Sequence, residues 1–382
     1  MTTLRVAIIH YWLLHMRGGE KVLESLCKLF SQADIFTHVY DENGVSATIR
    51  RHTVRTTGIS KLPAARKLYC SYLPLMPFAL ESLDLSGYDL VISSEAGPAK
   101  GVIAPPDAPH ICYCHSPMRY IWDQYHVYKS GAGRLAKLTM PLLAPGLRQW
   151  DVTSAARVDQ FVANSQHVQK RIAKYWRRDA QVVYPPVAVE NFSPAPLSER
   201  EEFYLWAGEL VGYKRPDIMI DAFNRTGKRL VVLGGPEKAR KALAAKAKDN
   251  ITFLGKVSFT ELKSHMARCK ALIFPGEEDF GIVPVEVMAS GRPVIAYGRG
   301  GATETVHDGE TGLLFEDQSV EGLLDAVERF ERSGLADADP YAIAAHTDRF
   351  SEQNFLAGMT EVFTSYGVRP QMSLDQIREA AQ

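Results

Sequence analysis

The 382-residue chain lacks the features that mark several classes of protein. No apolar run reaches the roughly 18 residues that a membrane span needs, and the N-terminus passes straight into a strand pattern without a signal-peptide pattern. The five cysteines are odd in number and scattered, and Cys112-x-Cys114 is not a usual zinc spacing. We therefore expect a cytoplasmic protein with reduced thiols, and we leave open a peripheral contact with the inner face of the membrane.

Two ligand motifs are also lacking. The full Gly-x-Gly-x-x-Gly fingerprint is missing, as is the acidic residue about 20 positions later, which argues against a nicotinamide dehydrogenase. We find no Asp-x-Asp pair placed to hold a divalent ion, so we expect no metal and no other cofactor.

Net charge is zero, but the two halves of the chain differ. Residues 1–190 hold 22 Lys and Arg against 15 Asp and Glu, a charge of +7. Residues 191–382 hold 22 against 29, a charge of −7. Either the basic half binds an anionic partner or the two halves attract each other. We expect no nucleic-acid partner.

Short apolar runs alternate with helical spacing along both halves, which predicts α/β architecture with two Rossmann-like, doubly wound parallel sheets. The chain length also favours two domains. We expect an N-terminal domain over residues 1–192 and a C-terminal domain over 200–350, joined near Pro194-Ala-Pro196. C-terminal helices over 351–382, one of them beginning at Ser373, are expected to cross back to the N-terminal domain.

Residues 271–291 carry the clearest sign of a ligand site. Ala271–Phe274 is typical of a buried strand, Pro284 suits a first helical position and Gly291 a helix end. The pattern therefore predicts strand, loop and helix, and ligands of open α/β sheets bind where such a strand ends.

Two kinds of group in this stretch fit a nucleotide sugar. The amides of Gly281, Ile282 and Val283 would point out of the helix N-terminus, where an anion is favoured. Glu286, one turn into the helix, can accept two hydroxyls such as those of a ribose, and Glu278 stays on the loop. An acidic surface loop before an ordinary helix fits the pattern as well.

Residues that could contact a ligand also follow predicted strands at three other places. Gly18-Gly19 opens a helix after the first strand, His115 follows the strand Ile111–Cys114, and Lys214-Arg215 precede a helix in the second half. A structural histidine and a solvated helix start are the alternatives. However, cations at a helix start oppose the helix dipole, which favours a bound anion.

Residues 61–80 combine three cations with aromatic residues and prolines. Such a segment fits a membrane surface, with Arg66 and Lys67 at lipid phosphates. A helical hairpin packed on the domain is the alternative.

The motifs, taken together, resemble those of family 4 glycosyltransferases, which are retaining enzymes of the two-Rossmann (GT-B) architecture, with the domains facing across a cleft. The matching segments follow the family's order over nearly the whole chain: Gly18-Gly-Glu-Lys-Val-Leu23, Ala163-Asn-Ser165, Tyr213-Lys-Arg-Pro-Asp217, Gly255-x-Val-Ser-x-x-Glu-Leu262, Glu278-x7-Glu286, Gly300-Gly-x-x-Glu304 and Asp308-Gly-x-Thr-Gly312. Tyr113-Cys-His-Ser-Pro-Met-Arg-Tyr120 resembles a subgroup rich in mannosyltransferases of bacterial polysaccharide and O-antigen assembly.

The resemblance implies a role for each matching residue. His115 and Glu278 would be catalytic, acting at the donor sugar, and Glu286 would bind the ribose. The other donor-binding residues would be Gly18, Gly19, Lys214, Arg215, Gly255, Val257, Phe280, Gly281, Ile282 and Val283. The acceptor would bind the basic first domain near Arg66, Lys67, Arg119 and Tyr120.

One position departs from the family pattern. Glu209 stands where the family usually has arginine, so a second phosphate cation is missing there. We hypothesise that Arg215 replaces it, in which case Arg215→Ala would raise the donor KM and lower kcat.

The predicted function is metal-independent transfer of a hexose, with mannose from GDP-mannose as the first choice, to a lipid-linked or polysaccharide-precursor acceptor. Three alternatives remain: a UDP-sugar donor, a hydrolysing epimerase that needs no acceptor, and a non-catalytic nucleotide-sugar-binding protein.

Overall fold

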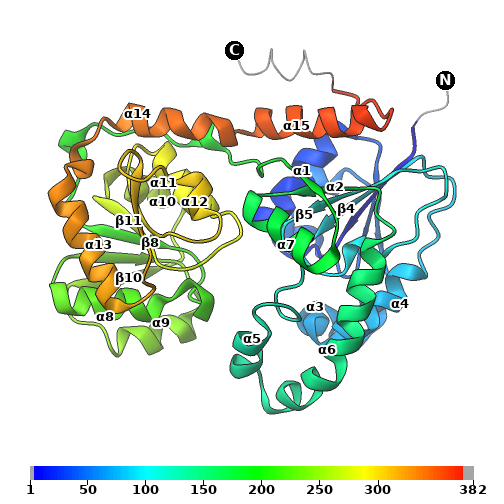
Figure 1. Ribbon diagram of the computed structural model, residues 1–382, viewed down its shortest axis with the longest axis horizontal. Helices are drawn as coiled ribbons and strands as arrows, with labels where there is room; N and C mark the ends of the chain where they lie inside the picture. The colour runs from blue at the N-terminus through cyan, green and yellow to red at the C-terminus, as the bar shows by residue number, and fades with distance from the viewer. Residues whose placement is uncertain (1–3, 373–382) are drawn as a thin grey trace. The chain divides into compact units, whose positions relative to one another are not determined.

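The computed structural model describes residues 4–372, which form two α/β units (Figure 1). The N-terminal unit runs to Pro186 and resumes at Gln353, and the C-terminal unit spans Val187–Glu352. The division therefore falls ahead of Pro194-Ala-Pro196. The helix predicted from Ser373 lies outside the described residues.

The N-terminal unit is built on a parallel sheet of seven strands in the order β3-β2-β1-β4-β5-β6-β7. The strands are β1 (Val6–His10), β2 (Asp34–Thr37), β3 (Val54–Thr56), β4 (Leu90–Glu95), β5 (His110–Cys114), β6 (Gln160–Ala163) and β7 (Ala180–Val182). The helices are α1 (Gly18–Leu29), α2 (Ala47–Arg50), α3 (Ala65–Leu68), α4 (Met76–Glu81), α5 (Tyr125–Gly131), α6 (Arg134–Ala155), α7 (Gln166–Trp176) and α15 (Glu352–Ser365).

The C-terminal unit has a parallel sheet of six strands in the order β10-β9-β8-β11-β12-β13. These are β8 (Tyr204–Ala207), β9 (Leu230–Leu233), β10 (Ile251–Gly255), β11 (Ala271–Phe274), β12 (Val294–Tyr297) and β13 (Gly312–Phe315). Its helices are α8 (Pro216–Thr226), α9 (Glu237–Ala244), α10 (Phe259–Arg268), α11 (Ile282–Ala289), α12 (Ala302–Thr305), α13 (Val320–Ser333) and α14 (Pro340–Ala345). Figure 1 shows α10, α11 and α12 on one side of this sheet and α8, α9 and α13 on the other.

Both sheets reverse their direction of growth at one point. In the N-terminal unit the chain steps outward from β1 to β3 and then returns to place β4 against the other side of β1. In the C-terminal unit the same reversal lies between β8 and β11. The crevice outside the carboxyl ends of the strands at such a reversal is where open α/β sheets bind their ligands.

The predicted fold class of two parallel α/β domains is confirmed, because every paired strand in both sheets is parallel. A capping box starts α10: Ser258 accepts from the Glu261 amide, and the Glu261 carboxylate accepts from the Ser258 amide. Apolar side chains of α15 enter the N-terminal core, where Phe363 meets Phe30 and Phe355 meets Tyr113 edge to face.

The structure differs from the expected local elements at two places. Pro284 is the third residue of α11, not the first, because Gly281 takes a left-handed conformation (φ +88°) and starts the helix two residues earlier. Residues 61–80 form no hairpin of two regular helices. They make the short α3, the 3-10 turn η3 (Tyr69–Leu75) and the short α4, since prolines at positions 63, 74 and 77 interrupt regular helix.

Candidate active site

Lys214 and Glu278 meet at the reversal point of the C-terminal sheet. Lys214 ends the 3-10 turn η7 (Gly212–Lys214) that follows β8, and Glu278 lies on the loop that follows β11. Lys214 Nζ is 2.7 Å from Glu278 Oε1, and both side chains are mostly buried. The pair forms because β8 and β11 are neighbours, although their sequences are far apart.

Glycines let these loops pack closely enough for the pair to form. A Cβ on Gly276 would lie 2.6 Å from Lys214 Cα, so a side chain there would push η7 away from the β11 loop. On the other side, the Gly301 amide donates to the Glu278 carbonyl at 2.8 Å, and a Cβ on Gly301 would overlap the Phe280 backbone. The Gly300-Gly301 motif therefore holds the Glu278–Phe280 loop in place.

Helix α11 begins next to this pair. No side chain caps it, so the amides of Gly281, Ile282 and Val283 stand at an N-terminus without a side-chain acceptor. Phe280 is buried against Phe350 and fixes the start of the helix. The N-terminus and the Lys214 ammonium together favour an anion at this position.

Glu286 lies one turn into α11 and remains partly exposed. Burial raises the pKa of its carboxyl to about 7. Within residues 4–372 its carboxylate has no hydrogen-bond or ion-pair partner, so both oxygens remain available to hydroxyl donors.

The guanidinium of Arg215 is already paired with a carboxylate of the helix that follows it. Its guanidinium donates from two nitrogens to Asp217, at 2.8 and 3.0 Å, and a third nitrogen reaches Gln318. The side chain of Gln318 in turn donates to the Pro275 carbonyl, next to the Lys214 loop. Arg215 therefore lies near the predicted phosphate position but is already neutralised by Asp217.

Gly255 is the last residue of a different strand, β10, and Val257 lies in the loop after it. The Gly255 carbonyl accepts from the Gly234 amide at 2.7 Å, which ties together the carboxyl ends of β9 and β10. A Cβ on Gly255 would overlap the guanidinium of Arg240, which covers it. Val257 is partly exposed in the loop before α10.

A chain of polar side chains occupies the reversal point of the N-terminal sheet. His115 follows β5, and its Nε2 lies 2.9 Å from the Ser94 hydroxyl on β4. The same hydroxyl lies 3.0 Å from Nδ1 of His10, the last residue of β1, and His10 Nε2 faces the Glu20 carboxylate at 3.7 Å. The four side chains thus form one row from α1 to β5.

The hydrogens on His115 are assigned from this row. The Glu20 carboxylate, 3.7 Å from His10 Nε2, favours a hydrogen on that nitrogen, and His10 Nδ1 then accepts from Ser94. The Ser94 oxygen must in turn accept from His115 Nε2–H, which leaves His115 Nδ1 as a hydrogen-bond acceptor. Burial, assisted by neighbouring His10, lowers the pKa of His115 to about 3, so the imidazole is neutral.

Gly18 and Gly19 are the first residues of α1, beside this row. A Cβ on Gly19 would overlap the Tyr11 hydroxyl and lie 3.6 Å from His115 Nε2. Sequence reasoning missed Tyr11, His10, Ser94 and Glu20. The signal was there, since His10 and Ser94 each stand at the end of an apolar strand.

The four predicted acceptor residues come from two segments of the N-terminal unit. Arg66 and Lys67 are exposed on α3, and Arg66 Nη1 lies 3.6 Å from Asp41. Arg119 and Tyr120 follow β5, where Arg119 Nε lies 3.4 Å from the Ser116 hydroxyl. The Tyr120 hydroxyl is buried and has no hydrogen-bond partner among the described residues.

No group of three or more His, Cys, Asp or Glu side chains within residues 4–372 is arranged to hold a metal ion. The sequence does contain one Asp-x-Asp, Asp337-Ala-Asp339. There Asp337 pairs with Arg200, and Asp339 accepts from the Tyr341 amide at the start of α14.

Family models match both halves of the chain. The model "Glycosyltransferase Family 4" matches residues 16–191, and "Glycosyl transferases group 1" matches residues 189–346. The chain is built from two glycosyltransferase domains. Lys214, Glu278 and Glu286 lie in the second of these domains. Glu20, Ser94 and His115 lie in the first, and His10 precedes the matched residues.

The similar curated proteins are glycosyltransferases as well. An uncharacterised glycosyltransferase of Methanocaldococcus jannaschii is 32% identical over 174 residues, 44% of this chain and 48% of the relative. A GDP-mannose-dependent α-(1-6)-phosphatidylinositol monomannoside mannosyltransferase of Mycobacterium tuberculosis is 31% identical over 192 residues, 43% of this chain and 50% of the relative. The chain spans about half the length of the curated relatives it matches.

Solved structures share the fold over almost the whole chain. Sucrose-phosphate synthase from Thermosynechococcus elongatus aligns with a TM-score of 0.71 at 17% identity, covering 95% of this chain and 99% of that one. HepE of Anabaena, in complex with UDP and glucose, aligns with a TM-score of 0.66 at 17% identity, covering 94% and 99%. At this identity the likeness shows the fold alone.

Proposed function

We propose that this glycosyltransferase is a retaining enzyme that transfers a hexose, with mannose from GDP-mannose as the first choice, to a lipid-linked or polysaccharide-precursor acceptor without a metal ion. The observation that carries the proposal is the Lys214–Glu278 pair beside the uncapped start of α11. A cation and exposed amides at a sheet reversal point suit a diphosphate. GDP-mannose is preferred because the Mycobacterium tuberculosis relative is named for it.

In this mechanism the diphosphate of the donor binds at Lys214 and the amides of Gly281–Val283. Lys214 then turns from Glu278 toward the phosphates, and it neutralises the charge that develops on the nucleoside diphosphate as the glycosidic bond breaks. A donor group placed in this way contributes about 3–4 kcal/mol to the transition state. The ribose hydroxyls donate to Glu286, and the released Glu278 carboxylate contacts the sugar.

His115 supports the sugar as a neutral hydrogen-bond acceptor. Its Nδ1 accepts from a sugar hydroxyl, which orients the ring while the anomeric carbon gains positive character. The acceptor hydroxyl attacks on the face that the diphosphate leaves, with the leaving phosphate oxygen taking its proton. This route needs no carboxylate nucleophile, and trapping of a covalent sugar adduct on Glu278 would contradict it.

The donor is tested by thermal shift and product analysis with GDP-mannose, UDP-glucose and UDP-GlcNAc. The true donor at 100 times its Kd should stabilise the chain by about 2.7 kcal/mol, and nucleoside diphosphate should accumulate only when an acceptor is present. A UDP-sugar is the second candidate, since HepE is solved with UDP and glucose. No shift with any donor at millimolar concentration would contradict the proposal.

The same assay separates two other functions. A hydrolysing epimerase would convert the sugar nucleotide without an added acceptor. A non-catalytic sugar-nucleotide-binding protein, favoured by Glu209 in place of an arginine, would show the thermal shift with no turnover under any acceptor.

Glu286 should make donor affinity depend on pH. Ribose hydroxyls bind the ionised carboxylate, and the pKa of this group is raised to about 7, so affinity should rise as pH increases through 7. The ionised fraction changes about tenfold between pH 6 and 8, and the Kd for the nucleotide sugar should fall by a similar factor. Calorimetry at both pH values measures it.

Glu286→Gln is the control for this titration, because glutamine keeps the shape and does not ionise. The Kd of this variant should be larger than that of the wild type at pH 8, and it should not change between pH 6 and 8. An intact nucleotide sugar is the right ligand, because its diphosphate has no protonation step in this range. Equal pH dependence in both proteins would show that another group is responsible.

A further inference from the structure

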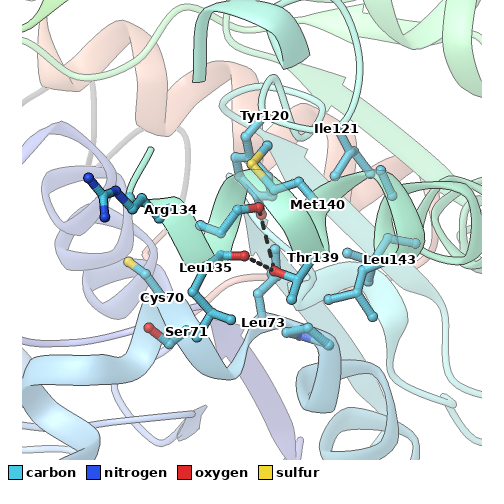
Figure 2. A pocket seen from close by; sticks show the side chains of 15 residues that line it. Cys70, Ser71, Leu73, Tyr120, Ile121, Arg134, Leu135, Thr139, Met140 and Leu143 are labelled. Atoms are coloured by element: carbon cyan, nitrogen blue, oxygen red, sulfur yellow. Dashed lines mark hydrogen bonds between the residues drawn. The ribbon is translucent and has the colours of Figure 1, made fainter. Parts of the chain in front are cut away.

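A cavity of about 650 Å³ lies in the N-terminal unit, between η3 and α6. Its lining is mainly apolar and includes Leu73, Pro74, Met140, Leu143 and Tyr120. Figure 2 shows side chains from both segments around the same space, with Arg134 at one edge. None of the donor-binding residues proposed above lines it, so the cavity is available for a different part of a substrate.

The helix that forms one wall also carries exposed apolar side chains, one of which, Leu135, lines the cavity as well. Leu135, Leu138 and Leu142 of α6 are 75%, 70% and 78% exposed. Their spacing of three and four residues places them on one face. Fully burying one leucine is worth about 1.5–3 kcal/mol, so an exposed row of three favours contact with an apolar phase. Among the described helices none is long and apolar enough to cross a membrane.

The charge of these two segments identifies that phase. Residues 61–80 and 124–150 together contain seven Lys and Arg and no Asp or Glu. The cations include Arg134 and Lys137, which are exposed beside the leucines. An amphipathic helix with leucines on one face and cations at its edge lies in the surface of an anionic bilayer, where each Lys or Arg adds about 1 kcal/mol.

Tyr120 connects the cavity to the His115 side of the unit. It lines the cavity, and its hydroxyl lies 3.8 Å from the position of a Cβ on Gly97. This Cβ position on Gly97 is also 3.7 Å from Tyr11 Cβ. The Tyr11 hydroxyl in turn packs against Gly19, which lies next to His115. A chain in the cavity would therefore have its polar end directed toward the residues proposed to hold the sugar.

We propose that this cavity binds the hydrocarbon chain of a lipid phosphate acceptor, taken from an anionic bilayer in which the α6 leucines are immersed. The inference rests on the proposed function for the identity of the headgroup, and it assigns the acceptor's lipid part to residues outside the donor site. The chain replaces water against an apolar lining, and the cations hold the phosphate at the surface.

Cys70 provides a direct test, because it lines the cavity and is exposed while the other four cysteines are buried. Dodecyl phosphate below its micelle concentration should slow alkylation of Cys70 by a maleimide at least tenfold. Butyl phosphate at the same concentration should not, since its chain is too short to fill the cavity. Equal alkylation rates with and without dodecyl phosphate, or equal protection by both phosphates, would overturn the proposal.

Ala136→Trp fills the cavity from α6. It should abolish the protection by dodecyl phosphate, while circular dichroism and the thermal shift with nucleotide sugar stay unchanged. A more conservative variant, Ala136→Leu, should reduce the protection partially. Protection that persists in a folded Ala136→Trp protein would place the alkyl chain elsewhere and contradict the assignment.

The bilayer contact is measured by flotation with vesicles of phosphatidylcholine and phosphatidylglycerol. Leu142→Asp should weaken binding at least tenfold. Tyr341→Asp is the matched control, because it replaces an apolar side chain that is 63% exposed on α14 of the other unit. Equal binding by the two variants would overturn the bilayer contact.

The two proposals fail in distinguishable ways. A chain that binds dodecyl phosphate and vesicles but no nucleotide sugar would contradict the proposed function alone. A chain that transfers sugar to a short saccharide but shows no Cys70 protection would contradict the lipid site alone.

Discussion

Lys214→Ala should lower kcat by about 10²–10³-fold, the effect of removing one well-placed group that stabilises transition-state charge. Lys214 is the cation whose ammonium contacts the β11 loop next to the start of α11, where it pairs with Glu278 at 2.7 Å. Its removal also leaves Glu278 partly buried beside the donor phosphates, which adds repulsion. Steady-state kinetics with the donor identified by thermal shift measures the loss.

Arg215→Ala is the matched control, one residue away with the same loss of charge. The sequence alone predicts a raised donor KM and a lowered kcat for it, because Arg215 was expected to replace the arginine missing at position 209. The bidentate contact with Asp217 leads us to expect a smaller loss than for Lys214→Ala, at most about tenfold. Equal losses in both variants would mean that Arg215 leaves Asp217 when the donor binds.

Glu278→Gln separates the two causes of the loss in Lys214→Ala, which are the missing positive charge and the repulsion between Glu278 and the donor phosphates. If repulsion by an unpaired Glu278 contributes, the double variant Lys214→Ala/Glu278→Gln should bind donor more tightly than Lys214→Ala alone. If the two substitutions add without interaction, the ion pair has no role in donor binding. A kcat within threefold of the wild type for Lys214→Ala would remove the main support for the proposed function.

The sequence predicted the fold because its strongest signals are local. Apolar runs such as Ala271–Phe274 are short and bounded by loop residues, and each forms a buried strand of the predicted sheet. The weaker strands β3 and β7 were not predicted. Val54–Thr56 and Ala180–Val182 lie at sheet edges, are at most partly buried and carry no apolar run. Edge strands depend on a neighbour for hydrogen bonds, which the local sequence does not record.

The candidate site was predictable where one stretch of chain supplies it. Glu278, Gly281 and Glu286 fall within nine residues, so a strand–loop–helix pattern was enough to group them. The partners from other strands were not predictable. Lys214 meets Glu278 across 64 residues because β8 and β11 pair, and Ser94 meets His10 across 84 residues because β1 and β4 pair. Strand order is a property of the whole sheet.

His115→Ala should lower kcat by about 10²-fold with a smaller change in donor KM, because His115 is proposed to act on the sugar and not on the nucleotide. Because the ring is neutral, the prediction also specifies how kcat should depend on pH. Since burial lowers the pKa of His115 to about 3, its charge should not change between pH 6 and 9. Loss of activity as pH rises through 6.5, present in the wild type and absent in His115→Asn, would show that the imidazolium is the active form.

Ser94→Ala tests whether the row behind His115 sets its hydrogens. The hydroxyl accepts from His115 Nε2–H and donates to His10 Nδ1, so its loss leaves both rings free to change tautomer. A typical hydrogen bond contributes about 0.5–1.5 kcal/mol, and we expect kcat to fall about three- to tenfold. Ser94→Thr, which keeps the hydroxyl, should recover most of the activity.

Nitrogen NMR of labelled histidine separates this role from a merely structural one. In the wild type the His115 signals should report a hydrogen fixed on Nε2, and in Ser94→Ala the two tautomers should exchange. His10→Phe should give the same loss of a single tautomer from the next position along the row, since Ser94 then has no acceptor for its hydrogen and is free to donate to His115 instead. A wild-type ring protonated on Nδ1 would reverse the direction of the hydrogen bonds that Ser94 makes with His10 and His115, and it would contradict the proposal that His115 accepts from the sugar.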